Sequence, residues 1–441
     1  MKKLVSIALA LALTASILAG CGKSAEPAAE QPKQEAPKAS VEKEEVKKEQ
    51  QEVTLTIFHQ MGEQAKRDAL QAWADGAAKA NPQYKYEVNA VSDPTQYKNL
   101  IKTKIAAGDP ADIMFGPPRD QMELIKAGNI ADVTGAPFIK NYDPEILKGV
   151  SVDGKIYGIP VDLGLLLVYY NKDIFEKNGI QIPKTYDEFI KVCETLKGKG
   201  INPVSYGFKD AWTAGVDFMF EWYMMLVKEP NMFKDVEAGT KKFKDYPMFK
   251  RGMERNRQRV AFSTNNPFGT DNNKSVQLFA SGQAAMFESG TWNISTIREL
   301  NKDGKFGMFM LPADNEADTR ARLFLDDCFM INAHAKSMDS AYSFFNFATS
   351  SEGANVWASK TGLIPAIKGV QLQNVDEMTK DAVAVKDSGK TIFADVQYQP
   401  TGQLFDLLFS KFSPDFLADT KKSVDDYIDQ FDQDYAEAAK Q

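Results

Sequence analysis

Histidine and cysteine are scarce in this chain, which limits the chemistry that it can perform. Its 441 residues include two histidines and three cysteines, and no CxxC, HExxH, GxSxG, GxGxxG or Walker pattern occurs. A structural zinc site and a disulfide framework are therefore excluded, and the usual general base of many hydrolases is nearly absent. We expect no bound metal, no cofactor and no catalytic residue. The 60 acidic residues would always place some carboxylate pair at a separation that suits glycoside hydrolysis, so their number does not argue for a glycosidase.

Positive charge is also in deficit. The formal net charge is −7, and it becomes −9 if Lys2 and Lys3 are removed with the leader described below. This balance argues against binding to nucleic acid and against electrostatic adhesion to anionic lipid.

A short apolar leader opens the chain. Lys2 and Lys3 precede an apolar run from Leu4 to Leu18, which is too short and too poorly flanked for a stable membrane span. Leu18-Ala19-Gly20-Cys21 has the pattern that bacterial lipoprotein processing requires. We therefore predict a signal peptide over residues 1–20 and a lipidated Cys21 that anchors an extracytoplasmic protein to the cell membrane. A secretion signal with an incidental cysteine is the alternative.

The next segment, residues 21–52, contains almost no large apolar side chain and mixes Glu, Lys, Ala, Pro and Gln. Such a composition cannot bury enough surface to offset chain entropy, so we predict a disordered tether. Pro27, Pro32 and Pro37 argue against a helical stalk.

About 390 residues remain after the tether, more than one hydrophobic core normally serves, so two domains are expected. Alternating strands at 53–57 and 84–90 and an apolar strand at 111–115 are separated by segments with helical periodicity. This β-α-β-α-β order predicts a parallel sheet wrapped by helices. Ligands are then expected at the carboxyl ends of the strands, in the loops 59–63 and 116–121.

The rest of the chain alternates between two kinds of region. A strand follows Lys155–Pro160, a capping box at Thr185 and Glu188 opens a helix, and the chain is then helix-rich to about 324. A strand at 323–332 and an amphipathic helix restore the first pattern, before an acidic, helical tail from about 371. We therefore predict two lobes joined by crossings near 162, 325 and 371, which form a hinge. Lobe 1 comprises 53–162 and 325–370, and lobe 2 comprises 163–324 and 371–441.

Two cysteines remain besides Cys21. Cys193 lies on the apolar stripe of a helix with Phe189, Val192 and Leu196, so we interpret it as a buried thiol. A disulfide between Cys193 and Cys328 is the less favoured alternative.

Three stretches resemble the family 1 extracellular solute-binding proteins of ABC importers, the group that contains maltose-binding protein. They are GKIYGIPVDLGLLLVYYNKDIFEKNGIQIPKTYDEF, LFASGQAAMFESGTW and AAGDPADIMFGPPRDQMELIKAGNIADVT. The similarity covers residues 53 to 441. It implies an α/β fold with two lobes, a periplasmic-binding-protein-like clamshell with three hinge crossings that closes on a saccharide and delivers it to a permease.

The resemblance also implies site residues. Trp292 falls where the family member stacks an aromatic ring on a sugar, Asp210 and Trp212 fall where it has a carboxylate and a tyrosine, and Arg119 and Asp120 replace an Asp-Arg pair in reversed order. Gly116 stands in place of a stacking tryptophan and Gly164 in place of a carboxylate. Asp162, on the same strand face as Gly164, could supply that acid. The loop after the first strand matches poorly, and His59, Gln60 and Glu63 are placed by position alone.

The chemistry of a sugar suits these residues. A pyranose has an apolar face and a rim of hydroxyl groups, so its site needs aromatic platforms and planar hydrogen-bonding side chains. Trp212 and Trp292 supply platforms, and the acceptors are Asp120, Asp162, Asp210, Asp326 and Asp327. Trp73, Trp222 and Trp357 are assigned to the core.

The expected protein is thus a membrane-anchored, monomeric solute-binding protein. Its expected ligand is a saccharide, in particular an oligosaccharide of undefined length, and its expected partners are ABC permease subunits. Two kinds of ligand remain open: a neutral sugar, or a sugar with a carboxylate that would pair with Arg119. A cell-surface glycan-binding protein or a glycosidase without a link to transport is the alternative.

Overall fold

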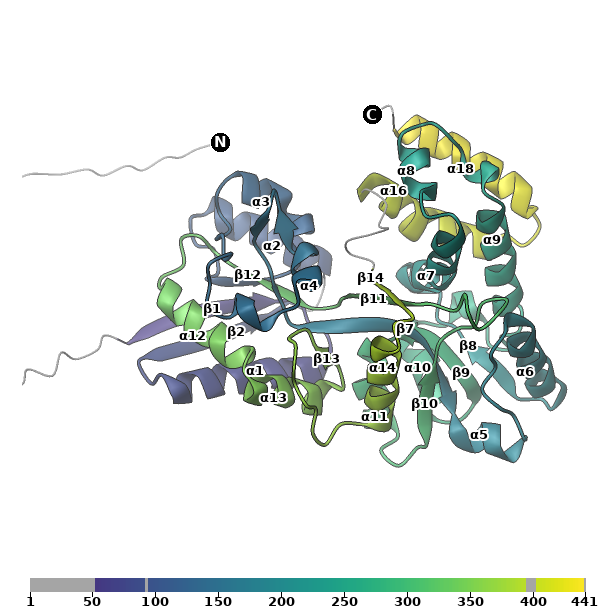
Figure 1. Ribbon diagram of the computed structural model, residues 1–441, viewed down its shortest axis with the longest axis horizontal. Helices are drawn as coiled ribbons and strands as arrows, with labels where there is room; N and C mark the ends of the chain where they lie inside the picture. The colour runs from purple at the N-terminus through teal and green to yellow at the C-terminus, as the bar shows by residue number, and fades with distance from the viewer. Residues whose placement is uncertain (1–51, 92–93, 394–401, 440–441) are drawn as a thin grey trace, which may run out of the picture. The chain divides into compact units, whose positions relative to one another are not determined.

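A computed structural model describes residues 52–91, 94–393 and 402–439, and Figure 1 shows its helices and strands. The predicted signal peptide, the lipidation site Cys21 and nearly all of the tether lie outside the described residues. None of the helices in the described ranges is long and apolar enough to cross a membrane.

The first sheet is built from both early and late parts of the chain. Its strands lie in the order β2-β1-β3-β12-β6, with β1 parallel to β2 and β3, and β12 antiparallel to β3 and β6. This confirms the predicted parallel β-α-β-α-β start. The bounds are β1 Val53–His59, β2 Tyr84–Ala90, β3 Ile113–Phe115, β6 Ile159–Pro160 and β12 Cys328–Ile331. A separate hairpin pairs β4 (Ser151–Val152) with β5 (Lys155–Ile156).

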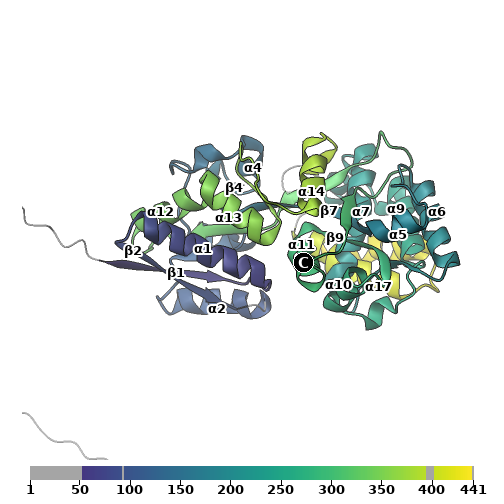
Figure 2. The same ribbon diagram turned by 90° about the horizontal axis from the view of Figure 1, so that it is seen from below.

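Helices cover both faces of the first sheet. Figure 2 shows α1, α12 and α13 on one face and α2 on the other. The predicted amphipathic helix is α12, which buries Ala341, Phe344, Phe345 and Ala348 as expected. The bounds in this region are α1 Gln64–Ala80, α2 Pro94–Ala106, α3 Met122–Lys126, α4 Pro144–Lys148, α12 Met338–Ala348 and α13 Ser351–Thr361.

The second sheet is organised around β7, whose first eight residues are all buried. An uninterrupted apolar run of this kind is typical of a strand that is covered on both faces. The main path is β14-β11-β7-β9-β8, and β10 and β13 also pair with β7. The bounds are β7 Asp162–Asn171, β8 Asn202–Ser205, β9 Ala284–Gly290, β10 Phe306–Phe309, β11 Ala321–Leu325, β13 Ile364–Pro365 and β14 Thr391–Phe393.

Many helices accompany the second sheet, as predicted for this helix-rich part. One of them, α6, begins at Thr185, whose hydroxyl oxygen accepts a hydrogen bond from the Glu188 amide at 3.3 Å. The Glu188 carboxylate accepts from Lys184 rather than from Thr185, so only half of the predicted capping box forms. The bounds are α5 Lys172–Lys177, α6 Tyr186–Gly198, α7 Ala211–Lys228, α8 Met232–Glu237, α9 Pro247–Val260, α10 Asn272–Ala280, α11 Ile294–Leu300, α14 Glu377–Asp387, α16 Gly402–Asp406, a π-helix Leu407–Phe412, α17 Ser413–Ala418 and α18 Val424–Ala438.

The single strand predicted at 323–332 is wrong. It is divided into β11, which belongs to the second sheet, and β12, which belongs to the first. The break falls at Asp326 and Asp327, where the backbone bonds to the segment around Asp162 instead of continuing one ladder: the Asp326 amide donates to the Asp162 carbonyl at 3.3 Å, and the Val161 amide donates to the Asp327 carbonyl at 2.9 Å.

The chain passes between the two sheets at three places, the number predicted. Val161 joins β6 to β7, Asp326 and Asp327 join β11 to β12, and the segment after Lys368 leads to α14, which packs on β10. Ile367 still forms a β-bridge with Tyr142, and the Lys368 amide donates to the Asn141 carbonyl at 2.9 Å. The third passage therefore lies after Lys368, near the predicted 371.

The tryptophans and cysteines assigned to the interior are buried. Trp73, Trp222 and Trp357 are at most 3 % exposed, and the rings of Trp73 and Trp357 lie 4.6 Å apart. Cys193 and Cys328 are both buried free thiols, so the alternative of a disulfide is wrong.

Candidate functional site

An aromatic surface lies beside the second sheet. Trp212 is in the first turn of α7, and Trp292 is in the 3-10 turn Thr291–Asn293 that follows β9. Their ring centroids are 6.1 Å apart, and the ring of Phe324 on β11 is 6.0 Å from that of Trp292. Trp212 is 40 % exposed, which is unusual for so large an apolar side chain. We call Trp212, Trp292 and Phe324 the aromatic surface.

Gly164 makes room for this surface. A Cβ atom at Gly164 would come 2.3 Å from the Phe324 ring, so the space of the missing side chain is taken by that ring. This accounts for the glycine at a position where the resemblance implies a carboxylate. Gly116, the other departure, has a φ of +126°, a backbone conformation that strongly favours glycine.

Asp210 lies directly before α7, two residues from Trp212. Its Oδ2 atom accepts a hydrogen bond from the Asn272 amide at 2.8 Å, which ties the start of α7 to the start of α10. The side chain is partly exposed. The structure therefore brings Asp210, Trp212 and Trp292 into one region, while their contact with a ligand stays a prediction.

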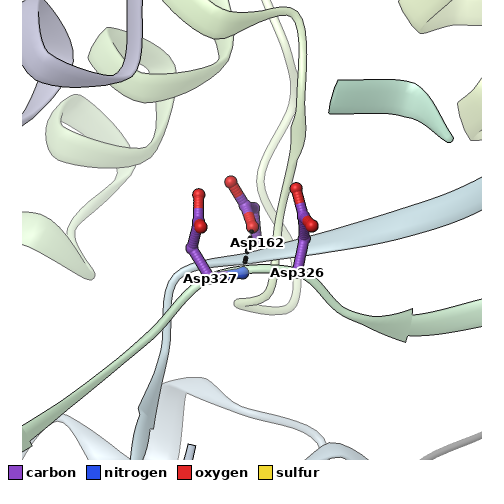
Figure 3. A group of neighbouring side chains, drawn as sticks. All are labelled: Asp162, Asp326 and Asp327. Carbon is purple, nitrogen blue, oxygen red and sulfur yellow. Dashed lines mark hydrogen bonds between the residues drawn. The ribbon is translucent and has the colours of Figure 1, made fainter. Parts of the chain in front are cut away.

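Three other predicted residues meet where the chain passes between the sheets. Figure 3 shows the carboxylates of Asp162, Asp326 and Asp327 side by side, and oxygen atoms of the three lie within 4.8 Å of one another. The Asp327 amide donates to Asp162 Oδ1 at 2.9 Å, and Trp357 Nε1 donates to Asp162 Oδ2 at 2.6 Å. Both oxygens of Asp162, which is fully buried, are thus engaged by the protein.

Lys66 of α1 supplies the positive charge of this group. Its Nζ atom lies 3.0 Å from Asp326 Oδ2 and 2.8 Å from Asp327 Oδ2, and the lysine is only 5 % exposed. Three carboxylates at this spacing would suit a cation, but the Lys66 ammonium already contacts two of them, so we assign no metal here. We call Lys66, Asp162, Asp326 and Asp327 the passage cluster.

Burial and mutual repulsion change the acidity of the passage cluster. Burial raises the pKa of Asp162 well above its usual range, and the Asp327 charge adds to this effect. Burial likewise raises the pKa of Asp327 to about 7, against the opposing effect of Lys66. For Lys66, burial lowers the pKa, but the neighbouring carboxylates outweigh burial and raise it overall. The cluster therefore favours bound protons on Asp162 and Asp327 and a charged Lys66.

The residues of the first predicted loop divide between interior and surface. His59, at the end of β1, is 1 % exposed, and its Nδ1 atom accepts from the Met61 amide at 3.1 Å. Burial, with a smaller effect from Arg67, lowers the pKa of His59 to about 4, so its imidazole is neutral at physiological pH. Gln60 and Glu63 are partly exposed, and the charge of Glu63 acts on Lys66.

Arg119 and Asp120 lie on the surface in the 3-10 turn Pro118–Gln121 that follows β3. Arg119 Nε is 3.9 Å from Asp120 Oδ1, and more than 40 % of each side chain is exposed. Their role in binding stays a prediction.

Three residues of this region were not anticipated from the sequence: Lys66, Phe324 and Arg322. Arg322 and Phe324 alternate along β11, so their side chains share one face, and this spacing was a usable signal. Lys66 gave no such signal, because its partners are 260 residues away in the chain.

Comparison with known proteins establishes the family. A model of the bacterial extracellular solute-binding proteins matches residues 72–429, and the chain belongs to this family. The family consists of binding proteins that act outside the cytoplasm.

Two relatives have low sequence identity to this chain, but each match covers more than half of both proteins. The chain is 24 % identical over 377 residues to the multiple sugar-binding protein of Streptococcus mutans, and the match covers 81 % of each chain. It is also 24 % identical over 278 residues to the melibiose/raffinose/stachyose-binding protein MelE of Bacillus subtilis, a match that covers 60 % of this chain and 62 % of that protein.

Solved structures agree with the fold. RafE in complex with raffinose is 23 % identical and superposes with a TM-score of 0.71, covering 88 % of this chain and all of that one. A sugar transporter from Bacillus licheniformis in complex with stachyose is 20 % identical with a TM-score of 0.68 over the same share of this chain. The fold is therefore that of the two-domain solute-binding proteins.

Proposed function

We propose that this protein captures a saccharide, in particular an oligosaccharide, on the aromatic surface and delivers it to the permease of an ABC transporter. The observation that carries the proposal is the pair of neighbouring tryptophans, Trp212 and Trp292, of which Trp212 is 40 % exposed beside the partly exposed Asp210. Aromatic platforms next to a hydrogen-bonding carboxylate suit the apolar face and the hydroxyl rim of a pyranose. The sugar-binding relatives support the same assignment.

A thermal-shift screen with neutral and acidic oligosaccharides tests the proposal. A ligand present at about one hundred times its dissociation constant should stabilise the protein by about 2.7 kcal/mol. Amino acids and short peptides serve as control ligands. Stabilisation by peptides and by none of the sugars would contradict the proposal.

We further propose that ligand binding closes two lobes around the three passages. In this proposal lobe 1 comprises 53–162 and 325–370, and lobe 2 comprises 163–324 and 371–441. A ligand can stabilise the closed form only through contacts that the open form lacks, so it must touch both lobes. Asp120 or Asp326 would act from one side, and Trp212 and Trp292 from the other.

Scattering and product analysis test this mechanism together. The radius of gyration should fall when the ligand is added, and chromatography should return the sugar intact, because binding without conversion needs no catalytic residue. An unchanged radius would contradict closure. A cleaved product would support the glycosidase alternative instead.

We also propose that the protein is a monomer anchored to the membrane by acyl chains on Cys21. Two or more acyl chains anchor a protein without a basic patch, which suits the net negative charge. A Cys21→Ser variant should leave the membrane fraction, with the wild-type protein as control. Retention of the variant on membranes at high salt would contradict the proposed anchor.

A further inference from the structure

The acidic groups near the proposed site are already matched by protein groups. Asp326 and Asp327 share the Lys66 ammonium, both oxygens of Asp162 accept hydrogen bonds, and Asp210 accepts from the Asn272 amide. The negative excess of the whole chain therefore does not describe the aromatic surface. Beside the aromatic surface there is also a positive charge that forms no ion pair with any described residue.

That charge belongs to Arg322, on β11 beside the aromatic surface. Its guanidinium carbon lies 4.5 Å from the centroid of the Phe324 ring and 5.6 Å from that of the Tyr223 ring. Its Nη1 atom donates to the sulfur of Met219 at 3.1 Å, and its buried Nε atom has no hydrogen-bond partner. Arg322 thus lies against aromatic rings and a thioether, which is a weak acceptor.

Arg322 differs in this respect from the other arginines of the described ranges. Arg259 in the interior, for example, pairs with Glu288 at 3.0 Å and also contacts Glu221 and Asp217. Each of the others likewise meets at least one oxygen atom of the protein: Arg67, Arg119, Arg251, Arg255, Arg257, Arg298 and Arg320. Arg322 is the one described arginine for which no contact with an oxygen atom of the protein is found.

A guanidinium that has lost part of its water without gaining an oxygen acceptor is a favourable partner for an anion. Arginine binds a carboxylate through two parallel N–H···O bonds, and stacking on an aromatic ring orients the planar group for such a contact. Phe324 lies between Arg322 and Trp292, so the cation adjoins the proposed sugar platform. A carboxylate on a sugar ring at this surface would complete the coordination of Arg322.

We propose that the saccharide carries a carboxylate, as a uronic acid does, and that Arg322 binds this group. This inference rests on the proposed function and deepens it. Arg322 selects the class of sugar, while Trp212 and Trp292 supply the apolar contact that neutral and acidic sugars share.

Matched sugars test the inference by titration calorimetry. Digalacturonate and trigalacturonate are compared with galactobiose and galactotriose, which carry a hydroxymethyl group in place of each carboxylate, and with the methyl-esterified uronides, which keep the shape but lose the charge. The wild-type protein should bind the uronides at least tenfold more tightly than either uncharged set. This advantage should shrink as the salt concentration rises.

Two variants assign the effect to Arg322. Arg322→Met should lose at least tenfold in affinity for the uronides and change less than about threefold for the neutral sugars, whereas Arg322→Lys should retain part of the preference. Arg320→Met is the control, because Arg320 donates to backbone carbonyl groups and should leave the preference unchanged. Circular dichroism checks that each variant is folded. If Arg322→Met does not fold, the uronide affinity of Arg322→Lys is compared with that of the wild type instead.

The outcomes separate the inference from the proposed function. Binding of the neutral sugars with no preference for the uronides would overturn the inference and leave the saccharide assignment intact. An uronide preference that survives Arg322→Met would overturn the role of Arg322. If no sugar in the broader screen stabilises the protein, both the proposed function and the inference are wrong.

Discussion

The indole ring of Trp292 lies directly on the backbone of Gly290. A Cβ atom at residue 290 would come 1.9 Å from the nearest ring atom, a distance that no real contact allows. The backbone of Gly290 has an ordinary φ of −85°, which any residue can adopt. A side chain at position 290 is therefore excluded by the Trp292 ring and not by the backbone conformation. The absence of a side chain at 290 therefore sets the position of the ring that we propose as a sugar platform.

Removing the Trp292 ring should weaken binding. We expect Trp292→Ala to reduce affinity for the saccharide by about 1.5 to 3 kcal/mol, the scale of burying a large apolar side chain. Leu300→Ala, at an exposed leucine of α11, is the control and should leave affinity unchanged. Calorimetry measures both variants. If the ligand-free Trp292→Ala variant is unfolded, Trp292 belongs to the core and not to the binding site.

Moving the ring without removing it gives a second test. Gly290→Ala should push Trp292 off the sheet and lower saccharide affinity at least fivefold, although the ring itself is retained. Gly239→Ala serves as a comparison for the cost of replacing glycine, because a Cβ atom there meets nothing within 4 Å, although its φ of +67° adds strain. Tryptophan fluorescence and calorimetry would follow the change. Unaltered affinity in Gly290→Ala would mean that the ligand does not depend on this ring position.

The passage cluster predicts a large effect on stability. Lys66→Met leaves buried carboxylates without their cation, and breaking a buried ion pair in this way typically costs about 3 to 5 kcal/mol. Lys336→Met is the matched control: this lysine is 61 % exposed at 3.7 Å from the buried Asp112, and its pair should contribute about 1 kcal/mol or less. Urea unfolding measures both. Equal losses in the two variants would contradict the central role of Lys66.

The same cluster predicts how stability depends on pH. The pKa of Asp327 is about 7 in the folded protein, above the ordinary value of 3.8 for an aspartate, so the folded state holds this proton more tightly than the unfolded state. Its contribution is then fully present at acidic pH and is lost as the pH rises from about 4 to about 7. Lys66, Asp162, Asp326 and Glu63 are the charged groups that act on this titration.

Asp327→Asn tests this pH dependence, because the variant lacks the titrating group. The stability of the variant relative to wild type should increase as the pH rises from 4 to 7, as measured by urea unfolding at each pH. A relative stability that is constant or that falls over this range would show that Asp327 does not hold the proton.

The sequence predicts the fold well where its signals are local. The strands β1 and β2 alternate between apolar and polar residues, and the first β-α-β-α-β unit could be identified from that period. The short strands β8 and β10, of four residues each, leave no usable period, and β9 was hidden in a stretch that was recognised only as a motif. The division of β11 from β12 depends on backbone bonds to Val161 and Asp162, which no local pattern reveals.

The candidate site was predicted only in part for the same reason. The resemblance identified Trp212 and Trp292, which the structure places together. It could not reveal that Lys66 pairs with both Asp326 and Asp327, because these partners become neighbours only when the sheets assemble. The positive charge of Arg322 is informative only once its surroundings are known to lack an oxygen acceptor.

The strand order has a consequence for the time at which the protein can fold. In the first sheet, β12 lies between β3 and β6, so residues 53–160 cannot complete that sheet until Cys328–Ile331 has been synthesised. The second sheet likewise waits for Thr391–Phe393, because β14 forms its edge. Pairings over such long stretches of chain form slowly, since loop closure must precede the contacts that stabilise it. The emerging chain therefore stays incompletely folded until nearly all of it is available, which suits a protein that must be threaded across a membrane before it folds.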